Sequence, residues 1–205
     1  MKNIIYSNPI VAILRNVQNE ILIDYVQALY HGGLRSFEIS FVTPNATAQI
    51  QLLKSHLPTD ALVGAGTILT PKAAEAAAIC GADYLLSPAT DEIVLKYCQA
   101  NNIPFMPGVF SPSDVAKSLQ YGFEMLKLFP AASLPGNYVK NLKGPFPSAE
   151  FVAVGGVNLN NALEYFNNGF AGVGIGSSLV EQKDFDTGAW RLISEKIAKQ
   201  LSLLP

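Results

Sequence analysis

Lys127 is the one ionisable residue in a run of large apolar side chains, MLKLF at positions 125–129. An ammonium group buried among such side chains loses hydration, which favours the uncharged amine and makes it a nucleophile. A nucleophilic lysine can form an imine with a carbonyl compound. The alternative is a lysine on the helix-facing side of its strand, whose flexible end reaches water. Strand alternation alone does not separate the two interpretations.

Glu38 interrupts a second apolar segment, FEIS at positions 37–40, in the same way. A buried carboxylate near a lysine can act as a general acid and base. The alternative is a structural salt bridge from Glu38 to Arg15 or to Lys127. The pair indicates chemistry more strongly than either residue does alone, because two ionisable groups inside one core need a reason to be there.

Glycine-rich segments follow the last two apolar runs of the chain. The first holds Gly155 and Gly156, and the second holds Gly176 followed by Ser177. Glycines let backbone N–H groups approach an anion closely, and a serine adds a hydroxyl donor. A turn without a ligand is the alternative for each segment alone, but the two together favour a phosphate site.

These residues sit in a repeating pattern of short apolar strands and longer amphipathic stretches. We predict strands at 10–14, 37–40, 62–66, 84–87, 105–109, 125–129, 151–154 and 172–176, and helices at 20–31, 71–80, 91–100, 113–121 and 159–168. Eight such units predict a (β/α)8 TIM barrel, with an open doubly wound sheet as the alternative. In a barrel, the catalytic groups lie at the C-terminal ends of the strands. Arg15, Thr67 and Pro88 occupy such ends.

Composition narrows the function classes. The chain has 205 residues, a formal net charge of −2 and only 15% charged residues. We therefore expect one domain over residues 1–205, no nucleic-acid partner and no membrane partner. No His, Asp and Glu spacing is typical of a metal site, and Cys80 and Cys98 are interpreted as buried thiols. Without a signal-peptide pattern, a cytoplasmic location is expected.

The motifs resemble those of the bacterial 2-keto-3-deoxy-6-phosphogluconate (KDPG) and 4-hydroxy-2-oxoglutarate (KHG) aldolases, including their 2-keto-3-deoxy-6-phosphogalactonate branch. The matching segments cover nearly the whole chain in order: PIVAILR (9–15), GGLRSFEISF (32–41), VGAGTIL (63–69), LLSPAT (85–90), IPFMPGVFSPSD (103–114), KLFPA (127–131), KGPFP (143–147), VGGVN (154–158) and GIGSSLV (174–180). KLFPA together with GAGT and the glutamate of the second strand is the most specific combination.

The resemblance implies a role for each matching residue. Lys127 would form the imine with the ketone of pyruvate, and Glu38 would move protons through water. Thr67 would help to hold the pyruvate carboxylate, while Pro88 and Phe129 would wall the pocket. The distal phosphate would be held by Gly155, Gly156, Gly176 and Ser177.

Two positions depart from the best-known pattern of the family. Some members place a carboxylate-binding arginine four residues after the glutamate, where this chain has Val42. Arg15, in the AILR motif, could supply that cation instead. Val154 stands where the phosphogluconate type often has threonine, which makes this chain more similar to the galactonate branch.

The leading hypothesis is therefore a cofactor-free class I aldolase that cleaves a 6-phosphorylated 2-keto-3-deoxy sugar acid to pyruvate and glyceraldehyde 3-phosphate. The resemblance adds 4-hydroxy-2-oxoglutarate as a further substrate, with pyruvate and glyoxylate as products, and implies a homotrimer. The rival functions are a sugar-phosphate epimerase on the same barrel, a metal-dependent pyruvate aldolase, and a sugar-phosphate binding protein without catalysis.

Overall fold

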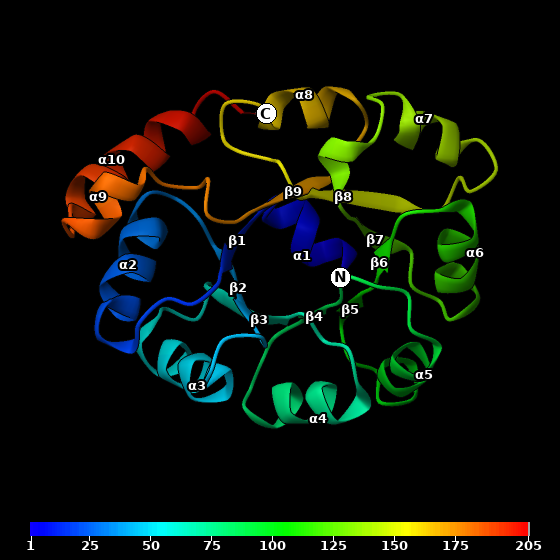
Figure 1. Cartoon of the computed structure of the whole chain (residues 1–205), viewed down its shortest axis with the longest axis horizontal. Helices are drawn as coiled ribbons and strands as arrows, with labels where there is room; N and C mark the ends of the chain where they lie inside the picture. The colour runs from blue at the N-terminus through cyan, green and yellow to red at the C-terminus, as the bar shows by residue number, and fades with distance from the viewer. Residues whose placement is uncertain (205) are drawn as a thin grey trace.

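Parallel strands curve into a nearly closed barrel in the computed structural model, which describes residues 1–204 (Figure 1). The strands are β1 (Ile10–Leu14), β2 (Ser36–Ser40), β3 (Leu62–Gly66), β4 (Leu85–Leu86), β5 (Phe105–Met106), β6 (Gly108–Val109), β7 (Met125–Leu128), β8 (Glu150–Val154) and β9 (Gly172–Ile175). They follow one another in the order β5-β4-β3-β2-β1-β9-β8-β7-β6, and every pairing is parallel. The predicted TIM barrel is confirmed, and the open sheet is excluded.

The two ends of this sheet are halves of one strand. The sequence predicts a single strand over 105–109, but Pro107 divides it into β5 and β6. Proline has no N–H to donate, so the ladder is interrupted there. The carbonyl of Pro107 still accepts a hydrogen bond of 2.9 Å from the N–H of Lys127. Since β5 continues directly into β6, the sheet returns to its starting point.

Helices surround the barrel. They are α2 (Asn19–His31), α3 (Ala46–His56), α4 (Pro71–Ile79), α5 (Glu92–Ala100), α6 (Pro112–Gln120), α7 (Tyr138–Lys143), α8 (Ala162–Asn167), α9 (Gln182–Asp186) and α10 (Trp190–Leu201). A short 3-10 turn, η1 (Ala131–Ser133), follows β7. No helix within residues 1–204 is long and apolar enough to cross a membrane.

The five predicted helices are all present, and their boundaries follow from end chemistry. Thr70 accepts a hydrogen bond from the N–H of Ala73 at the start of α4, and Asp91 caps α5. The stretch predicted as helix over 159–168 forms a helix only from Ala162. Side-chain hydrogen bonds between Asn158 and Asn161 hold residues 158–161 in a turn instead. The sequence did not predict α3, α7, α9 or α10, nor the helix at Lys2–Ser7.

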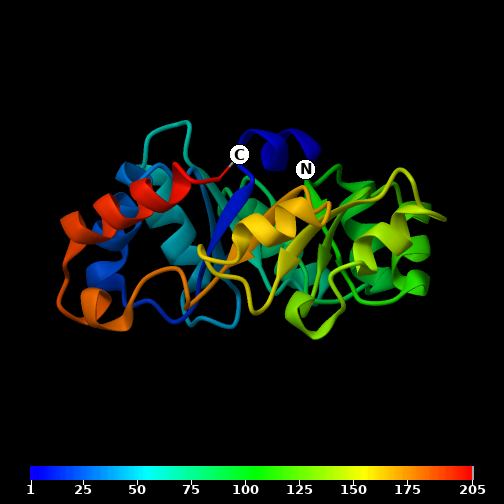
Figure 2. The same cartoon turned by 90° about the horizontal axis from the view of Figure 1, so that it is seen from above.

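One of these additional helices, α1 (Lys2–Ser7), lies across the N-terminal end of the barrel (Figures 1 and 2). Its Ile5 is fully buried in a lumen cluster that includes Val11, Tyr84 and Val152. Strand residues that alternate with this cluster, such as Phe37 and Val173, instead belong to the large core between barrel and helices. α1 thus covers the N-terminal end of the lumen, opposite the C-terminal ends of the strands.

Candidate active site

Lys127 faces the barrel lumen. Its neighbours Leu126 and Leu128 belong to the cluster between the sheet and helices α6 and α7, whereas Met125 belongs to the lumen cluster. Side chains alternate between the two faces of a strand, so Lys127 lies on the same side as Met125. It is only 5% exposed, and its Nζ lies 5.6 Å from the centroid of the Phe129 ring. The alternative of a helix-facing lysine is therefore wrong.

Glu38 reaches the lumen from β2, and Gly66 of β3 leaves room for it. In the register of the two strands Glu38 lies beside Gly64, and its carboxylate extends over Gly66. A Cβ atom at Gly66 would overlap that carboxylate. Glu38 is 1% exposed, and its Oε2 is buried without a hydrogen-bond partner in the described residues. A buried carboxylate oxygen without a protein partner is available to a water molecule or a bound ligand.

The two ionisable groups face one lumen from opposite walls. β2 and β7 are separated by β1, β9 and β8 in the order of the sheet. Across residues 1–204, no ion pair joins Glu38 to Lys127 or to Arg15. The structural salt bridge considered from the sequence is thus not formed. Both groups are left free to interact with a molecule that enters between them.

Thr67 and Pro88 lie at neighbouring strand ends. The backbone of Thr67 has a left-handed φ of 60°, and its hydroxyl lies 2.9 Å from the Ser40 hydroxyl at the end of β2. Pro88 packs its backbone against Gly108, which is the register partner of Lys127. Thr67 therefore lies beside the end of the strand that carries Glu38, and Pro88 lies beside the residue that pairs with Lys127.

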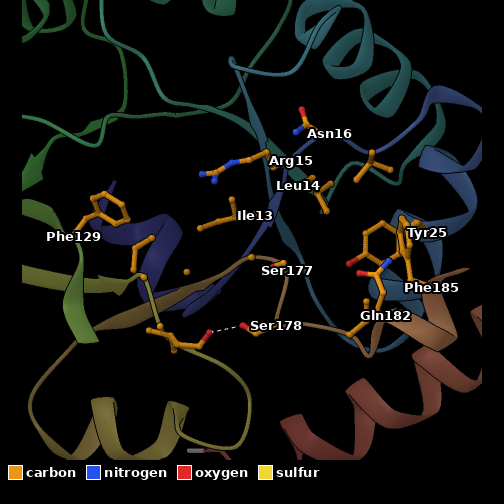
Figure 3. Close-up of a pocket in the computed structure, with 18 residues that line it drawn as sticks. Ile13, Leu14, Arg15, Asn16, Tyr25, Phe129, Ser177, Ser178, Gln182 and Phe185 are labelled. Atoms are coloured by element: carbon orange, nitrogen blue, oxygen red, sulfur yellow. Dashed lines mark hydrogen bonds between the residues drawn. The ribbon is translucent and has the colours of Figure 1, made fainter. Parts of the chain in front are cut away.

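A cavity of about 510 Å³ opens at the C-terminal ends of β1, β8 and β9 (Figure 3). It is lined by six of the predicted residues, namely Arg15, Phe129, Gly155, Gly156, Gly176 and Ser177. Ile13 and Val154 line it too and also contact the lumen cluster, so they connect the two spaces. Lys127, Glu38, Thr67 and Pro88 do not line this cavity.

The two glycine loops differ in their surroundings: Gly155 and Gly156 combine a constrained backbone conformation with close packing, whereas Gly176 lies beside open space. Gly155 and Gly156 both have positive φ angles, 93° and 80°, a conformation that other residues rarely adopt. A Cβ atom at Gly176 would meet nothing within 4 Å. Its backbone thus borders open cavity space, as a group that binds an anion through N–H donors must.

Side chains from both loops fix this arrangement. Ser178 donates a hydrogen bond of 2.7 Å to the carbonyl of Val157, which ties the loop after β9 to the loop after β8. Asn161 donates to the carbonyl of Gly156 at 3.1 Å. The N–H of Ala132 donates to the carbonyl of Gly155, so the segment after β7 is connected as well. The pattern GGVN indicated the loop, but not the role of Asn161.

One end of the cavity was not predicted. Tyr25 lines it together with Gln182 and Phe185 (Figure 3). Tyr25 does pack as well, with its ring centroid 4.9 Å from that of Phe185, and burial raises the pKa of its phenol. No motif marks these residues, because they come from α2 and α9, outside the strand ends.

Neither a cysteine nor a metal-binding cluster is part of this cavity within residues 1–204. Cys80 and Cys98 are free and buried, as predicted. Within residues 1–204, no group of three or more His, Cys, Asp or Glu side chains is placed to hold a metal ion.

A barrel with polar groups in its lumen and an open, glycine-lined mouth places this protein among the (β/α)8-barrel folds. Residues 1–196 match the family described as KDPG and KHG aldolase. A 2-dehydro-3-deoxy-phosphogluconate aldolase of Treponema pallidum is 35% identical over 140 residues, which are 68% of this chain and 66% of that protein, just under two thirds. A probable 2-dehydro-3-deoxy-6-phosphogalactonate aldolase of Rhizobium meliloti is 33% identical over 83% of this chain and 81% of its own length.

A solved structure agrees over almost the whole fold. KDPG aldolase from Legionella pneumophila, crystallised with pyruvate captured as a covalent carbinolamine, superposes with a TM-score of 0.88. The two chains are 31% identical, and the match covers 97% of this chain and 96% of that one. The chain belongs to the KDPG and KHG aldolase family.

Proposed function

We propose that this protein is a class I aldolase that cleaves a 2-keto-3-deoxy-6-phospho sugar acid to pyruvate and glyceraldehyde 3-phosphate. The observation that carries the proposal is the buried Lys127, which faces the lumen without a carboxylate partner in the described residues. The family assignment and the covalent pyruvate adduct of the Legionella pneumophila relative support it.

The proposed reaction begins with attack of the Lys127 amine on the C2 carbonyl of the substrate. The carbinolamine loses water and becomes a protonated imine. The C3–C4 bond then breaks as the C4 hydroxyl loses its proton, and the bonding electrons move into the imine to give an enamine. Glyceraldehyde 3-phosphate leaves. Protonation of the enamine at C3 and hydrolysis of the imine release pyruvate and restore the amine.

Glu38 is the group we assign to the proton transfers. Its carboxylate faces the same lumen as Lys127, and its Oε2 has no hydrogen-bond partner within residues 1–204. A carboxylate so placed can pass a proton to or from the carbinolamine hydroxyl and the enamine through one water molecule.

The two ends of the substrate require separate anion sites. For the carboxylate we propose Thr67 and Arg15, with Pro88 and Phe129 as walls. In Figure 3, the Arg15 guanidinium extends from the end of β1 toward the side of the cavity on which Phe129 lies. For the phosphate we propose the backbone of Gly155, Gly156 and Gly176 with the Ser177 hydroxyl, all of which line the same cavity.

The direct test is reductive trapping. Incubation with pyruvate and borohydride should reduce an imine to a stable secondary amine, which mass spectrometry of proteolytic peptides locates. We expect a pyruvyl adduct on Lys127. Turnover of a sugar phosphate without any adduct would indicate an epimerase or, if a chelator abolishes the activity, a metal-dependent aldolase, and binding without turnover or adduct would indicate a binding protein.

The configuration at C4 of the substrate is a separate proposal. Val154 lines the cavity and places a methyl group where threonine would offer a hydroxyl, which supports the phosphogalactonate epimer. We expect a higher kcat/KM for that epimer than for the phosphogluconate epimer, and Val154→Thr should shift the ratio toward phosphogluconate. Equal values for the two epimers in the wild-type protein would show that Val154 does not set the preference. Assays with 4-hydroxy-2-oxoglutarate would define the range further.

We also propose a homotrimeric assembly in the cytoplasm, with residues 1–205 as one domain. Exposed apolar side chains on one side of the barrel support an assembly: Val42 is 56% exposed, Leu69 50% and Phe110 45%. They follow β2, β3 and β6 and so gather at the C-terminal rim. Light scattering should give three times the chain mass of 22.0 kDa. A mass of one chain would contradict the proposal.

A further inference from the structure

The loop between β1 and α2 carries Arg15, yet this side chain is exposed and makes no hydrogen bond or ion pair with any other residue in the range 1–204. Its direction therefore depends on how the backbone of the loop is held. The next residue, Asn16, has a left-handed φ of 55°. That conformation is uncommon for a residue other than glycine and persists only where the surroundings hold it.

Thr43 supplies one of the contacts that hold the loop. The N–H of Asn16 donates a hydrogen bond of 3.1 Å to the Thr43 hydroxyl, across 27 residues of sequence. Thr43 is only 6% exposed and follows Val42 in the loop after β2. The strained residue next to Arg15 is thereby tied to the neighbouring strand end.

Gln49 supplies the second set of contacts, from α3. Its Nε2 donates to the carbonyl of Val17 at 2.8 Å and to Oδ1 of Asn19 at 2.7 Å. Gln49 is only 3% exposed, and the next residue, Ile50, is fully buried in the core. A buried amide is costly unless it is hydrogen-bonded, so an apolar residue would serve packing at this position better. The two hydrogen bonds to the β1–α2 loop account for an amide at this buried position.

We propose that Thr43 and Gln49 are positioning residues that fix the backbone beneath Arg15 and thereby set the affinity for the carboxylate of the keto acid. The inference rests on the proposed function, because it takes Arg15 as the carboxylate-binding cation. The loop after β2 has Val42 and no cation at the position expected for the arginine. It contributes instead through Thr43, which helps to hold Arg15 on the neighbouring loop. Neither Thr43 nor Gln49 lines the cavity, so each acts through the backbone of the β1–α2 loop.

The test measures trapping of pyruvate by borohydride as a function of pyruvate concentration, which gives a half-saturating concentration and a saturated rate. Gln49→Met keeps the length of the side chain but removes both hydrogen bonds. We expect it to raise the half-saturating concentration about tenfold, the size of effect that loss of buried hydrogen bonds produces. The saturated rate should change far less, since Lys127 and Glu38 lie on other strands.

Two further variants make the test specific. Gln51→Met changes an exposed glutamine on the same helix and should leave both values at those of the wild type. Thr43→Val removes the hydroxyl that accepts from Asn16 and should reproduce the rise, so it serves if Gln49→Met does not fold. Circular dichroism and thermal unfolding identify such a failure.

A double-mutant cycle distinguishes positioning from general destabilisation. On an Arg15→Leu background, Gln49→Met should have little further effect on the half-saturating concentration, because the group that it positions is gone. Additive effects, or a fall in the saturated rate alone, would overturn the inference while the proposed function stands. Absence of any adduct in the wild-type protein would overturn both.

Discussion

Replacing Lys127 with methionine is expected to lower kcat/KM for the phosphorylated keto acid by at least about 10³-fold and to abolish borohydride trapping of pyruvate, since the nucleophile is lost. Methionine has nearly the length of lysine and suits the apolar surroundings of Met125 and Phe129. The fold should therefore persist, with unchanged or raised thermal stability, because an unpaired buried amine is removed. A coupled assay for pyruvate measures the rate.

Lys140→Met is the matched control, because Lys140 is exposed on α7. It should retain wild-type activity and trapping. If the Lys127 variant kept substantial cleavage activity, the covalent mechanism would be wrong, whatever the stability of the protein. A variant that lost activity together with its folded structure would be replaced by Lys127→Arg, which keeps the charge but lacks a readily deprotonated amine.

Glu38→Gln is the second change with a large expected effect. Loss of general acid and base catalysis typically lowers a rate by about 10² to 10⁴-fold. The amide is almost isosteric with the carboxylate that extends over Gly66, so packing should be retained. Trapping of pyruvate should become slower, but the adduct should still form on Lys127 because the nucleophile remains. Rapid-quench trapping followed by mass spectrometry separates these two effects.

Glu75→Gln, at an exposed position of α4, controls for the loss of a negative charge and should behave as the wild type. Complete absence of the adduct in the Glu38 variant would assign Glu38 to the attack itself. Unchanged turnover would remove Glu38 from the mechanism and leave its buried, unpartnered oxygen without a function.

The barrel could be predicted from the sequence because buried parallel strands appear as short, continuous apolar runs bounded by turn residues. The same property made it impossible to predict which face of its strand carries the Lys127 side chain. Both faces of β7 are apolar, with Met125 in the lumen and Leu126 toward the helices, so no alternation marks the inner face. Pairing of β7 with its neighbours is a long-range property, and only the folded barrel shows which side is inside.

Other parts of the site left no local signal. From the sequence, Gln49 is an ordinary helix-surface residue. Its contacts with the β1–α2 loop appear only once α3 is placed beside that loop. Tyr25 reads as a core aromatic, and it is one, but its α2 position also brings it to the end of the cavity. Pro107 could have indicated the break in the fifth strand, because proline cannot complete a ladder of hydrogen bonds. Motifs mark the residues that contact a ligand better than those that hold them.

The glycines of β3 have a consequence for how this protein can change over generations. Gly64 leaves space for the ring of Tyr84, and Gly66 leaves space for the carboxylate of Glu38. Any larger residue at position 66 would displace the glutamate before it affected anything else. Drift at this position is therefore permitted only in descendants that have already given up a glutamate at position 38, and such a lineage would keep the barrel without the carboxylate to which we assign the proton transfers.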